Sequence, residues 1–592
     1  MLRKFIWVIM CCLMVISLVA TSCSTTETGV KQEEDEQEEV KIEVIEGKTE
    51  EKEQEEEVAG PEGPQYGGTI TLRRTADPNA WDPFFFTGFE ATMYLEQLAR
   101  RTLEVGPDVF DFMTRFYPEE YRGGGLAESW ETNPEMTEIT FHVRQGINWQ
   151  DLPPVNGREF TASDIEYHYH RMLGMGSGFT TGSPNISLRS FSPISTVTAT
   201  DKYTVVFELK EPSLQLLEQL TMDSSYGYIE PREGVEEWGD VNDWKHAIGT
   251  GPFMVDDYVS GSSSTFVRNP NYWRSDALYP ENQLPYADKA QLLIIPDDST
   301  AIAALRTGNI DLLDNISWER AARILETNPE MLTATTLRDG IGIGLVVDKA
   351  PFDDIKVRKA MQMAMDLETI AATYYGGTVD PTPAGLQGTI FTGYYVPYDE
   401  WPQEIKDGYA YNPEGAKALL AEAGYPDGFK CTLTASSTSD LDLFQIAAAY
   451  LSDIGIEMTL DVIEASSFIT TLRAEKHEMY TTTSTQNAIP PRVNVNRRYS
   501  GHPNYAEHHI KDAVFDDLTT KILYSLDPEE VKNLCKEADM RAIEQQWVVD
   551  LLSPVSYTLY QPWLHNFYGQ NLTELGNLVA WMWIDKDLKA SR

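Results

Sequence analysis

The chain of 592 residues is poor in basic side chains, in cysteine and in long apolar runs. Lysine and arginine together number 47, against 92 aspartates and glutamates, and the formal net charge is −45. Contacts with nucleic-acid phosphates require clustered lysine and arginine. The shortage of basic residues therefore argues against a nucleic-acid partner.

An apolar run at the N-terminus is too short to span a membrane. Arg3 and Lys4 precede FIWVIMCCLMVISLVA, which is shorter than the roughly 20 residues of a membrane-spanning helix. A basic start followed by a short apolar run and small residues is typical of a secretory signal. We therefore expect residues 1–22 to be a signal peptide.

Cys23 follows this run directly. The ending Ala20-Thr21-Ser22-Cys23 resembles the bacterial lipobox, in which the signal is removed before a cysteine that carries diacylglycerol. Alanine replaces the usual leucine at the third position before the cysteine. Ordinary cleavage that leaves Cys23 free and an uncleaved anchor are the alternatives. We predict lipidation at Cys23, which anchors the protein to the outer face of the cytoplasmic membrane.

An acidic segment follows the predicted lipidation site. Residues 31–57 hold fourteen acidic side chains against four basic ones and no aromatic residue. Such a composition buries too little surface to fold, and its charges repel one another. We expect residues 23–63 to form an extended tether, which fits a globule held to a membrane by a lipid.

Five cysteines are too few for a disulfide framework in a chain of this length. Cys11 and Cys12 belong to the predicted signal and Cys23 to the predicted lipid anchor. Only Cys431 and Cys535 remain. These two residues can pair in an oxidising compartment, but we expect two inert, partly buried thiols.

Sequence motifs of common enzymes are missing. The chain contains no GxSxG, Walker A, HExxH or paired CxxC motif, and its many carboxylates single out no acid–base pair. His168 and His170 stand two residues apart on a predicted helix and point in different directions. We therefore expect a protein without catalytic activity and without a cofactor.

One stretch, GHPNYAEHHI, gathers His502, Glu507, His508 and His509. A suitable loop can bring such side chains to one metal ion, but neither their number nor their spacing is diagnostic. We interpret the stretch as a solvated surface loop without a metal.

Strand and helix patterns alternate along the chain. Residues 292–315 predict a strand, a capped helix and a second strand. YNPEGAKALLAEAGYPDGF predicts a helix with Asn412 as its N-cap. One amphipathic helix, capped at Asp353 or Asp354, is predicted for residues 351–377. This alternation implies mixed or parallel sheets covered by helices, which is the α/β class.

Residues 248–273, IGTGPFMVDDYVSGSSSTFVRNPNYW, predict a β-hairpin with a turn at Gly261. The same run resembles the signature of the extracellular solute-binding proteins of family 5, the peptide, nickel and oligosaccharide receptors of ABC importers. Further segments between residues 66 and 570 resemble the same family in its order: LAESWETNPEMTEITFHVRQGINWQD, FTASDIEYHYHRM, ALRTGNIDLL, PFDDIKVRKAMQMAMD and YNPEGAKALLAEAGYPDGF.

The resemblance implies a periplasmic-binding-protein-like fold of two lobes with mixed sheets. It also implies a hinge between the lobes, an extra domain in the N-terminal lobe, and a scaffold role for the hairpin. The implied limits are residues 64–112, 247–338 and 558–592 for domain I, 113–246 for domain II and 339–557 for domain III.

The resemblance further implies a binding function. A ligand is captured in the cleft between the lobes by hinge closure, and the closed protein, expected to be a monomer, docks on the permease subunits of an ABC importer. We predict a peptide or a similar small oligomeric solute as the ligand. The alternatives are a surface sensor or adhesin of the same fold, and a receptor for an oligosaccharide or a metal chelate.

The expected ligand wall departs from that of peptide receptors in the family, which commonly hold the α-amino group with an acidic side chain. No aspartate or glutamate stands between Glu478 and Glu507. Neutral hydrogen-bonding groups and guanidinium groups stand there instead, which suit a carboxylate, phosphate or hydroxylated ligand. Alternatively, the arginines only pair with acids at the cleft rim. The predicted ligand contacts are Thr483, Ser484, Gln486, Asn487 and Arg492, with Arg497 and Arg498 nearby.

Three loop aromatics, Trp81, Phe85 and Tyr394, are predicted to line the mouth of the cleft. They lie in segments punctuated by proline and glycine, outside helices with a core period. Exposed loop aromatics can stack on sugars or peptide side chains. Alternatively, each ring packs its loop on its own lobe.

Overall fold

The computed structural model describes residues 63–591 except for 86–87, 103, 115–118, 185–190, 192, 222–226, 484–491, 493–494, 496, 503 and 573–574. The predicted signal peptide, Cys23 and almost all of the predicted tether lie outside the described residues. Within the described part of the chain, no helix is long and apolar enough to cross a membrane.

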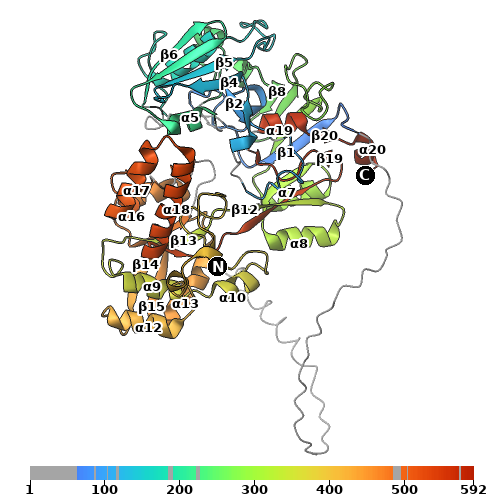
Figure 1. Ribbon diagram of the computed structural model, residues 1–592. Coiled ribbons are helices and arrows are strands. Elements are labelled where there is room, and N and C mark those ends of the chain that lie inside the picture. Colours follow the sequence, from blue (N-terminus) through green and yellow to red (C-terminus); the bar gives the residue numbers. More distant parts are fainter. Residues whose placement is uncertain are drawn as a thin grey trace, which may run out of the picture. The chain divides into compact units, whose positions relative to one another are not determined.

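A mixed seven-stranded sheet is built from segments at both ends of the described chain (Figure 1). β1 runs parallel to its neighbours β10 and β11, and the other neighbouring pairs are antiparallel. The strands, in spatial order, are β12 (Leu332–Leu337), β18 (Val555–Tyr560), β11 (Leu312–Ile316), β1 (Thr69–Arg74), β10 (Lys289–Ile294), β9 (Ser263–Arg268) and β8 (Phe253–Val259).

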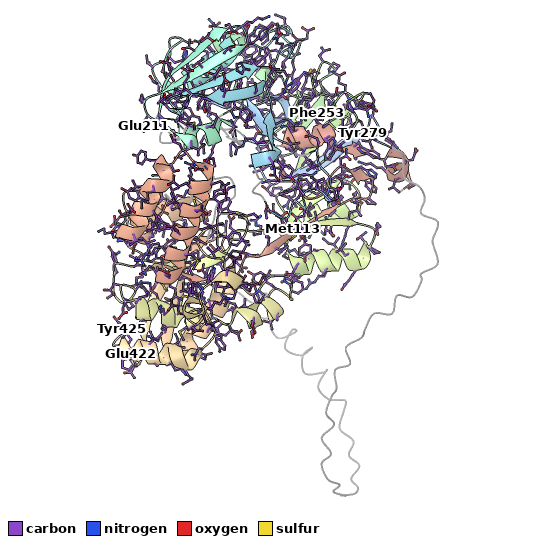
Figure 2. The ribbon with its side chains drawn as sticks, viewed as in Figure 1. Met113, Glu211, Phe253, Tyr279, Glu422 and Tyr425 are labelled. Atoms are coloured by element: carbon purple, nitrogen blue, oxygen red, sulfur yellow. The ribbon has the colours of Figure 1, made fainter. Side chains whose placement is uncertain are left out.

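Two sequence predictions for this sheet are confirmed. β10, α7 (Asp298–Arg306) and β11 form the strand–helix–strand unit, and the Asp297 side chain caps the helix by accepting from the Thr300 N–H at 2.8 Å. β8 and β9 form the hairpin. Phe253 (Figure 2) and Phe266 are buried in the core behind it, where their alternation along the strands places them.

A mixed five-stranded sheet is built from residues between 341 and 550. β14 is parallel to both of its neighbours, whereas β13 is antiparallel to both of its own. The strands, in spatial order, are β15 (Ile456–Ile463), β14 (Phe429–Ser436), β16 (Met479–Thr483), β13 (Ile341–Leu345) and β17 (Val548–Asp550). Three helices bury apolar faces in the core of this sheet: α9 (Ile355–Met363), α12 (Pro413–Glu422) and α13 (Leu441–Asp453).

A third, antiparallel sheet has four strands and a core of its own. Its strands, in spatial order, are β4 (Ala127–Thr132), β5 (Glu138–Val143), β7 (Thr204–Leu209) and β6 (Ile194–Asp201). α3 (Ala162–Leu173) packs on it and begins with a capping box formed by Thr161 and Asp164. The mixed α/β class is confirmed, while the residue limits of the three domains stay a prediction.

The remaining elements are short strands and helices around the three sheets. They are β2 (Ala99–Arg101), β3 (Arg122–Gly124), β19 (Leu564–His565), β20 (Trp583–Ile584), α2 (Ala91–Tyr94), α5 (Leu214–Thr221), α6 (Arg232–Trp238), α8 (Trp318–Thr327), α10 (Leu367–Thr373), α11 (Gln403–Lys406), α14 (Ala465–Arg473), α16 (Tyr505–His508), α17 (Ala513–Tyr524), α18 (Pro528–Gln545), α19 (Leu575–Trp581) and α20 (Lys586–Ala590), with 3₁₀ turns at Glu119–Tyr121, Trp244–His246 and Tyr398–Glu400.

The prediction of one helix over residues 351–377 is wrong, because the segment forms two helices. α9 ends at Met363 and α10 begins at Leu367. Asp366 separates them: its side chain accepts from the Thr369 N–H at 2.9 Å and caps α10. An aspartate inside an amphipathic pattern thus acts as an N-cap instead of a surface residue.

Two short segments connect the seven-stranded sheet with the five-stranded sheet. Residues 338–340 lead from β12 to β13, and residues 551–554 lead from β17 to β18. The Arg338 N–H donates to the Pro554 carbonyl at 2.8 Å, so the two connections run side by side. We call them the paired crossovers.

Candidate functional site

A cavity of about 690 Å³ opens beside the paired crossovers. The first group of lining residues comes from the ends of β11 and β12 and the starts of α8 and β18: Asn315, Ile316, Ser317, Trp318, Glu319, Arg338, Asp339, Pro554, Val555 and Ser556. The second group comes from the five-stranded sheet and its helices: Ile341, Tyr374, Tyr375, Ser436, Thr438, Ser439, Asp440, Phe444, Phe468, Ile469, Leu472, Tyr480, Thr481, Thr482, Thr483 and Glu507.

Hydroxyl groups form one wall of this cavity. Ser436 ends β14, and its Oγ lies 2.9 Å from the Oγ1 of Thr438. The Oγ of Ser439 lies 2.9 Å from the Oγ1 of Thr481 on β16. These residues stand at the carboxyl ends of neighbouring parallel strands, where ligands bind in open α/β sheets.

Aromatic rings form a second wall that joins the two groups of lining residues. The indole N–H of Trp318 at the start of α8 donates to the Tyr374 carbonyl at 3.1 Å. The Tyr374 hydroxyl donates to Asp440 Oδ1 at 2.7 Å, and its ring meets Tyr375 edge to face at 4.9 Å. Burial and the nearby Asp440 carboxylate raise the pKa of Tyr374, so the phenol stays protonated and can stack on a ligand.

Two charged groups in the lining have protein partners. Arg338 donates to Asn315, and Glu507 lies 3.5 Å from Arg473. Burial raises the pKa of Glu507, and Arg473 offsets part of this rise. Burial also raises the pKa of Tyr480 to about 12. The cavity therefore combines hydroxyl groups and aromatic faces with a few charged side chains, a lining suited to reversible binding.

The structure sorts the arginines of the predicted ligand wall. Arg492 is buried and forms an ion pair with Glu218 of α5, with Nε and Oε2 3.0 Å apart. Arg498 is also buried, and its Nη2 donates to the Thr483 carbonyl at 3.4 Å. Arg497 is half-buried, and its carbonyl lies 3.2 Å from the Nε2 of His508.

Of the eight predicted ligand contacts, Thr483 lies in the cavity lining. Trp81, Phe85, Tyr394 and Arg492 are not among the lining residues, and Ser484, Gln486 and Asn487 lie outside the described residues. Tyr394 is half-buried against the cluster that contains Leu386 and Phe515. Ligand contact by these residues stays a prediction.

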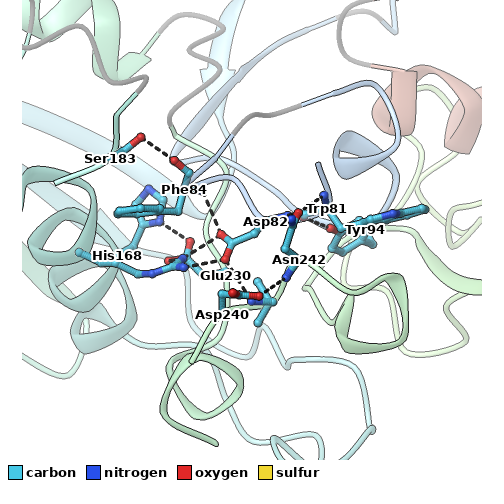
Figure 3. A network of polar contacts seen from close by, with 11 residues as sticks. Trp81, Asp82, Phe84, Tyr94, His168, Ser183, Glu230, Asp240 and Asn242 are labelled. Atoms are coloured by element: carbon cyan, nitrogen blue, oxygen red, sulfur yellow. Dashed lines mark hydrogen bonds and ion pairs between the residues drawn. The ribbon is translucent and has the colours of Figure 1, made fainter. Parts of the chain in front are cut away.

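A buried ionic network holds the loop that carries Trp81 and Phe85 (Figure 3). Asp82 accepts from both terminal nitrogens of Arg171, at 2.8 and 2.6 Å, and Arg171 also donates to Glu230 at 2.8 Å. The Nδ1 of His168 lies 2.6 Å from the other Glu230 oxygen. Burial alone raises the pKa of Glu230, but His168 and Arg171 outweigh it and lower the pKa to about 2.

The same network determines how the loop aromatics lie. Asp82 Oδ1 accepts from the Phe84 N–H at 2.9 Å, and the Arg171 guanidinium lies 4.7 Å from the Phe84 ring centroid. Trp81 is 6% exposed and packs against Tyr258, while Phe85 is 37% exposed. The loop therefore buries Trp81 in its own core and leaves Phe85 at the surface.

The interpretation of GHPNYAEHHI as a solvated surface loop is wrong. Residues 505–508 form α16, and His508 and His509 are buried. Burial lowers the pKa of His508 to about 3, so the ring is neutral. No group of three metal-ligating side chains occurs among the described residues. Cys431 and Cys535 are free thiols, as predicted, and both are fully buried where partial burial was expected.

Sequence reasoning missed most of the cavity lining. Ser436 to Asp440 read SSTSD directly after a predicted strand, so their place at a strand end was visible. Trp318 and Tyr374 gave no such signal, because their contact joins two residues that stand 56 positions apart in the sequence.

The chain belongs to the bacterial extracellular solute-binding proteins of family 5, since the model of the middle region of this family matches residues 123–506. Heme-binding protein A of Haemophilus influenzae is 28% identical over 355 residues, which cover 56% of this chain and 60% of that protein. The chain thus spans less than two thirds of this relative. The periplasmic oligopeptide-binding protein OppA of Salmonella typhimurium is 24% identical, with 79% of this chain and 86% of OppA covered.

A solved structure has the same fold. The periplasmic binding protein DppA from Helicobacter pylori, in complex with the peptide STSA, superposes with a TM-score of 0.67 at 23% identity, covering 88% of this chain and 99% of that chain. This likeness confirms the predicted periplasmic-binding-protein-like fold.

Proposed function

We propose that the protein is the extracytoplasmic substrate-binding component of an ABC importer, and that it captures a peptide or a similar small oligomeric solute. One observation carries this proposal: the 690 Å³ cavity beside the paired crossovers has hydroxyl and aromatic walls supplied by both sheets. A volume of this size suits a ligand of a few residues. The name of OppA and the peptide bound to DppA support the peptide class.

The paired crossovers act as the hinge in this proposal. Two three- or four-residue segments are the kind of connection that absorbs a change in backbone angles while the sheets stay rigid. Ligand that contacts both walls stabilises the closed state and shifts the population toward it. The closed protein then docks on the permease, and catalysis plays no part.

Native mass spectrometry of the purified protein, before and after denaturation and refolding, tests capture. A discrete extra mass that disappears on refolding is expected, and its fragments identify the ligand. Trp318→Ala removes an aromatic wall and is expected to lose the extra mass. Trp244→Ala, at a position outside the cavity lining, is the matched control and retains it.

Transport needs its own test. Deletion of the chain in its source cell is expected to abolish uptake of the identified solute. If the deletion strain takes up the solute normally while the purified protein binds it in vitro, the protein is a sensor of this solute and not a component of its importer.

We also propose that Cys23 carries the lipid that anchors the protein to the membrane. The lipobox-like ending and the acidic segment after it support this proposal. Cys23→Ser is expected to release the protein into the aqueous phase on detergent partitioning, whereas the neighbouring Ser24→Ala stays in the detergent phase. Equal partitioning of both variants would contradict lipidation.

A further inference from the structure

A second cavity gathers three arginines in a chain that is otherwise acidic. It has a volume of about 620 Å³ and lies around β2, β4 and β5 (Figure 1). Its lining includes Arg100 of β2, Arg144 directly after β5, and Arg274. Among the described residues, none lines both this cavity and the one beside the paired crossovers. The three guanidinium groups therefore mark a separate candidate binding site.

Arg144 is held in place but keeps donors without a partner. Its Cζ lies 4.9 Å from the centroid of the Trp273 ring, and its Nε donates to the Gly125 carbonyl at 3.3 Å. The indole N–H of Trp273 donates to Glu96 at 3.0 Å, which fixes the ring. Within the part of the chain that the structure describes, the two terminal nitrogens of Arg144 form no hydrogen bond or ion pair. A guanidinium held in this way can offer two parallel N–H groups to an oxyanion.

Arg100 and Arg274 share one buried carboxylate. The Oε2 of Glu104 lies 2.9 Å from Arg100 Nη1, and Glu104 also pairs with Arg274. Burial alone raises the pKa of Glu104, but the two guanidinium groups outweigh it and lower the pKa to about 2. Glu104 is therefore ionised, and one negative charge stands against two positive ones. The buried Nε of Arg100 has no hydrogen-bond partner among the described residues.

Two further carboxylates lie near these arginines. Glu128 is exposed and lines the cavity. Glu96 is buried and accepts hydrogen bonds from two aromatic side chains. Burial raises the pKa of Glu96, which these hydrogen bonds and Arg274 only partly offset. Neither glutamate forms an ion pair with an arginine in the described ranges. The positive charge of Arg144 is therefore not neutralised by direct contact.

The net charge of −45 does not prevent an anion from binding here. At physiological ionic strength, exposed charges are screened over about 8 Å. Acidic groups elsewhere on the surface therefore act only weakly on this cavity. The arginines in its lining determine the local potential.

We propose that this cavity binds the phosphate group of a small organic molecule, with Arg144 as the main contact and Arg100 and Arg274 as further positive charges. The volume leaves room for an organic group beside the phosphate. A phosphate has up to two negative charges and three acceptor oxygens, so it matches several guanidinium groups better than a carboxylate does. A soluble phosphate ester or the headgroup of a membrane lipid can supply this group.

Isothermal titration with glycerol 3-phosphate, at an ionic strength of about 0.15 M, tests the proposal. The purified protein is expected to bind glycerol 3-phosphate. Glycerate, a carboxylate of similar size, is expected to bind about tenfold more weakly or worse, because it has less charge and fewer acceptor oxygens. Equal affinity for the two compounds overturns the assignment to phosphate.

Variants of the lining test where the phosphate binds. Arg144→Gln is expected to weaken binding about tenfold or more, because a charge-assisted contact with two N–H groups is lost. Arg144→Lys keeps the charge without the paired N–H groups and is expected to keep part of the affinity. Arg320→Gln is the matched control, because it removes an exposed arginine that pairs with Asp298 outside the cavity. Wild-type affinity in Arg144→Gln overturns the proposal.

Glu128→Gln tests the site with Arg144 intact. It removes an exposed carboxylate from the lining and is expected to tighten binding about two- to fivefold. This variant and Arg144→Lys decide the question if Arg144→Gln does not fold. Unchanged affinity in both of them overturns the proposal.

Vesicles of phosphatidylglycerol separate the two sources of phosphate. The Cys23→Ser background is used, so that the predicted lipid does not hold the protein on the bilayer. Co-sedimentation that Arg144→Gln abolishes identifies a lipid headgroup, whereas binding of glycerol 3-phosphate without co-sedimentation identifies a soluble ester. If neither probe binds in a way that depends on Arg144, the proposal is overturned. The proposed function is then untouched, because its solute binds in the other cavity.

Discussion

Arg492 and Glu218 form a two-contact ion pair although 274 residues separate them in sequence. Arg492 Nε lies 3.0 Å from Glu218 Oε2, and Nη2 donates to Oε1 at 3.2 Å. The arginine side chain is 1% exposed and the glutamate 17%. By the predicted limits α5 belongs to domain II and Arg492 to domain III, so this pair would join two predicted domains outside the paired crossovers.

A double-mutant cycle on this pair is expected to show coupling. Glu218→Gln and Arg492→Gln each leave one buried charge without its partner, and the double variant removes both charges. The two changes are therefore expected to be non-additive in the free energy of unfolding by about 1–3 kcal/mol. Thermal unfolding of the four ligand-free proteins measures the coupling. Additive effects would mean that the two charges do not interact in solution.

The buried network around Arg171 is expected to be essential for stability. Arg171→Met removes the charged partner of the buried Asp82 and one of the two partners of the buried Glu230, which keeps His168, so we expect a loss of about 3–5 kcal/mol. Arg232→Met breaks an exposed pair with Glu236 one turn away and is expected to change stability by about 0.5 kcal/mol or less. Chemical denaturation of both variants makes the comparison. Similar losses in the two variants would contradict the role of the network.

Two adjacent glycines offer a test of the aromatic wall. Gly376 and Gly377 both have positive φ, 59° and 74°. A Cβ at Gly376 would lie 2.5 Å from Cη2 of Trp318, whereas a Cβ at Gly377 meets nothing within 4 Å. Gly376→Ala is therefore expected to displace Trp318 and weaken solute binding, in addition to about 1–2 kcal/mol of backbone strain.

Gly377→Ala carries the strain alone and is the control for the Gly376 variant. Isothermal titration with the solute identified by mass spectrometry, combined with thermal unfolding, separates the two effects. If both variants bind the solute with the same affinity, the position of Trp318 does not matter for binding.

Local sequence patterns predicted most of the helices and strands, whereas the cavity depends on contacts between residues far apart in the sequence. The Asn412 cap, the 248–273 hairpin and the β10–α7–β11 unit depend on residues a few positions apart, and all three are found. Asp366 shows the limit even at short range, because the same aspartate fits an exposed helix face and an N-cap.

Burial of polar residues was harder to predict from the sequence than the helices and strands. His508 and His509 read as surface residues, since histidine and glutamate side by side carry no apolar pattern, yet tertiary packing buries both histidines. The Arg171 network likewise depends on Asp82, which is 89 residues away in sequence. Nothing in either local segment indicates its partner.

Asp539 is expected to make stability depend on pH. It lies in α18, and its Oδ1 accepts from the Leu386 and Gln387 N–H groups at 2.9 and 3.0 Å. Burial raises the pKa of Asp539 from 3.8 to about 7, although these hydrogen bonds favour the charged form. The folded state therefore holds a proton that the unfolded state releases near pH 4.

The sign of the effect follows from this difference in pKa. Below about pH 4 both states are protonated and the contribution of Asp539 is fully present. As the pH rises from 4 toward 7 the unfolded state gains stability relative to the folded state, and above pH 7 the loss of folded-state stability levels off.

Asp539→Asn keeps the Oδ1 acceptor and removes the titration. Its free energy of unfolding is therefore expected to match that of the wild type at pH 4 and to exceed it by up to about 4 kcal/mol at pH 8. Asp461→Asn, at an exposed position, controls for the loss of one negative charge in an acidic chain. Thermal unfolding of the three proteins at pH 4, 6 and 8 makes the measurement, and a constant difference between Asp539→Asn and the wild type across this range would show that Asp539 is charged in the folded protein.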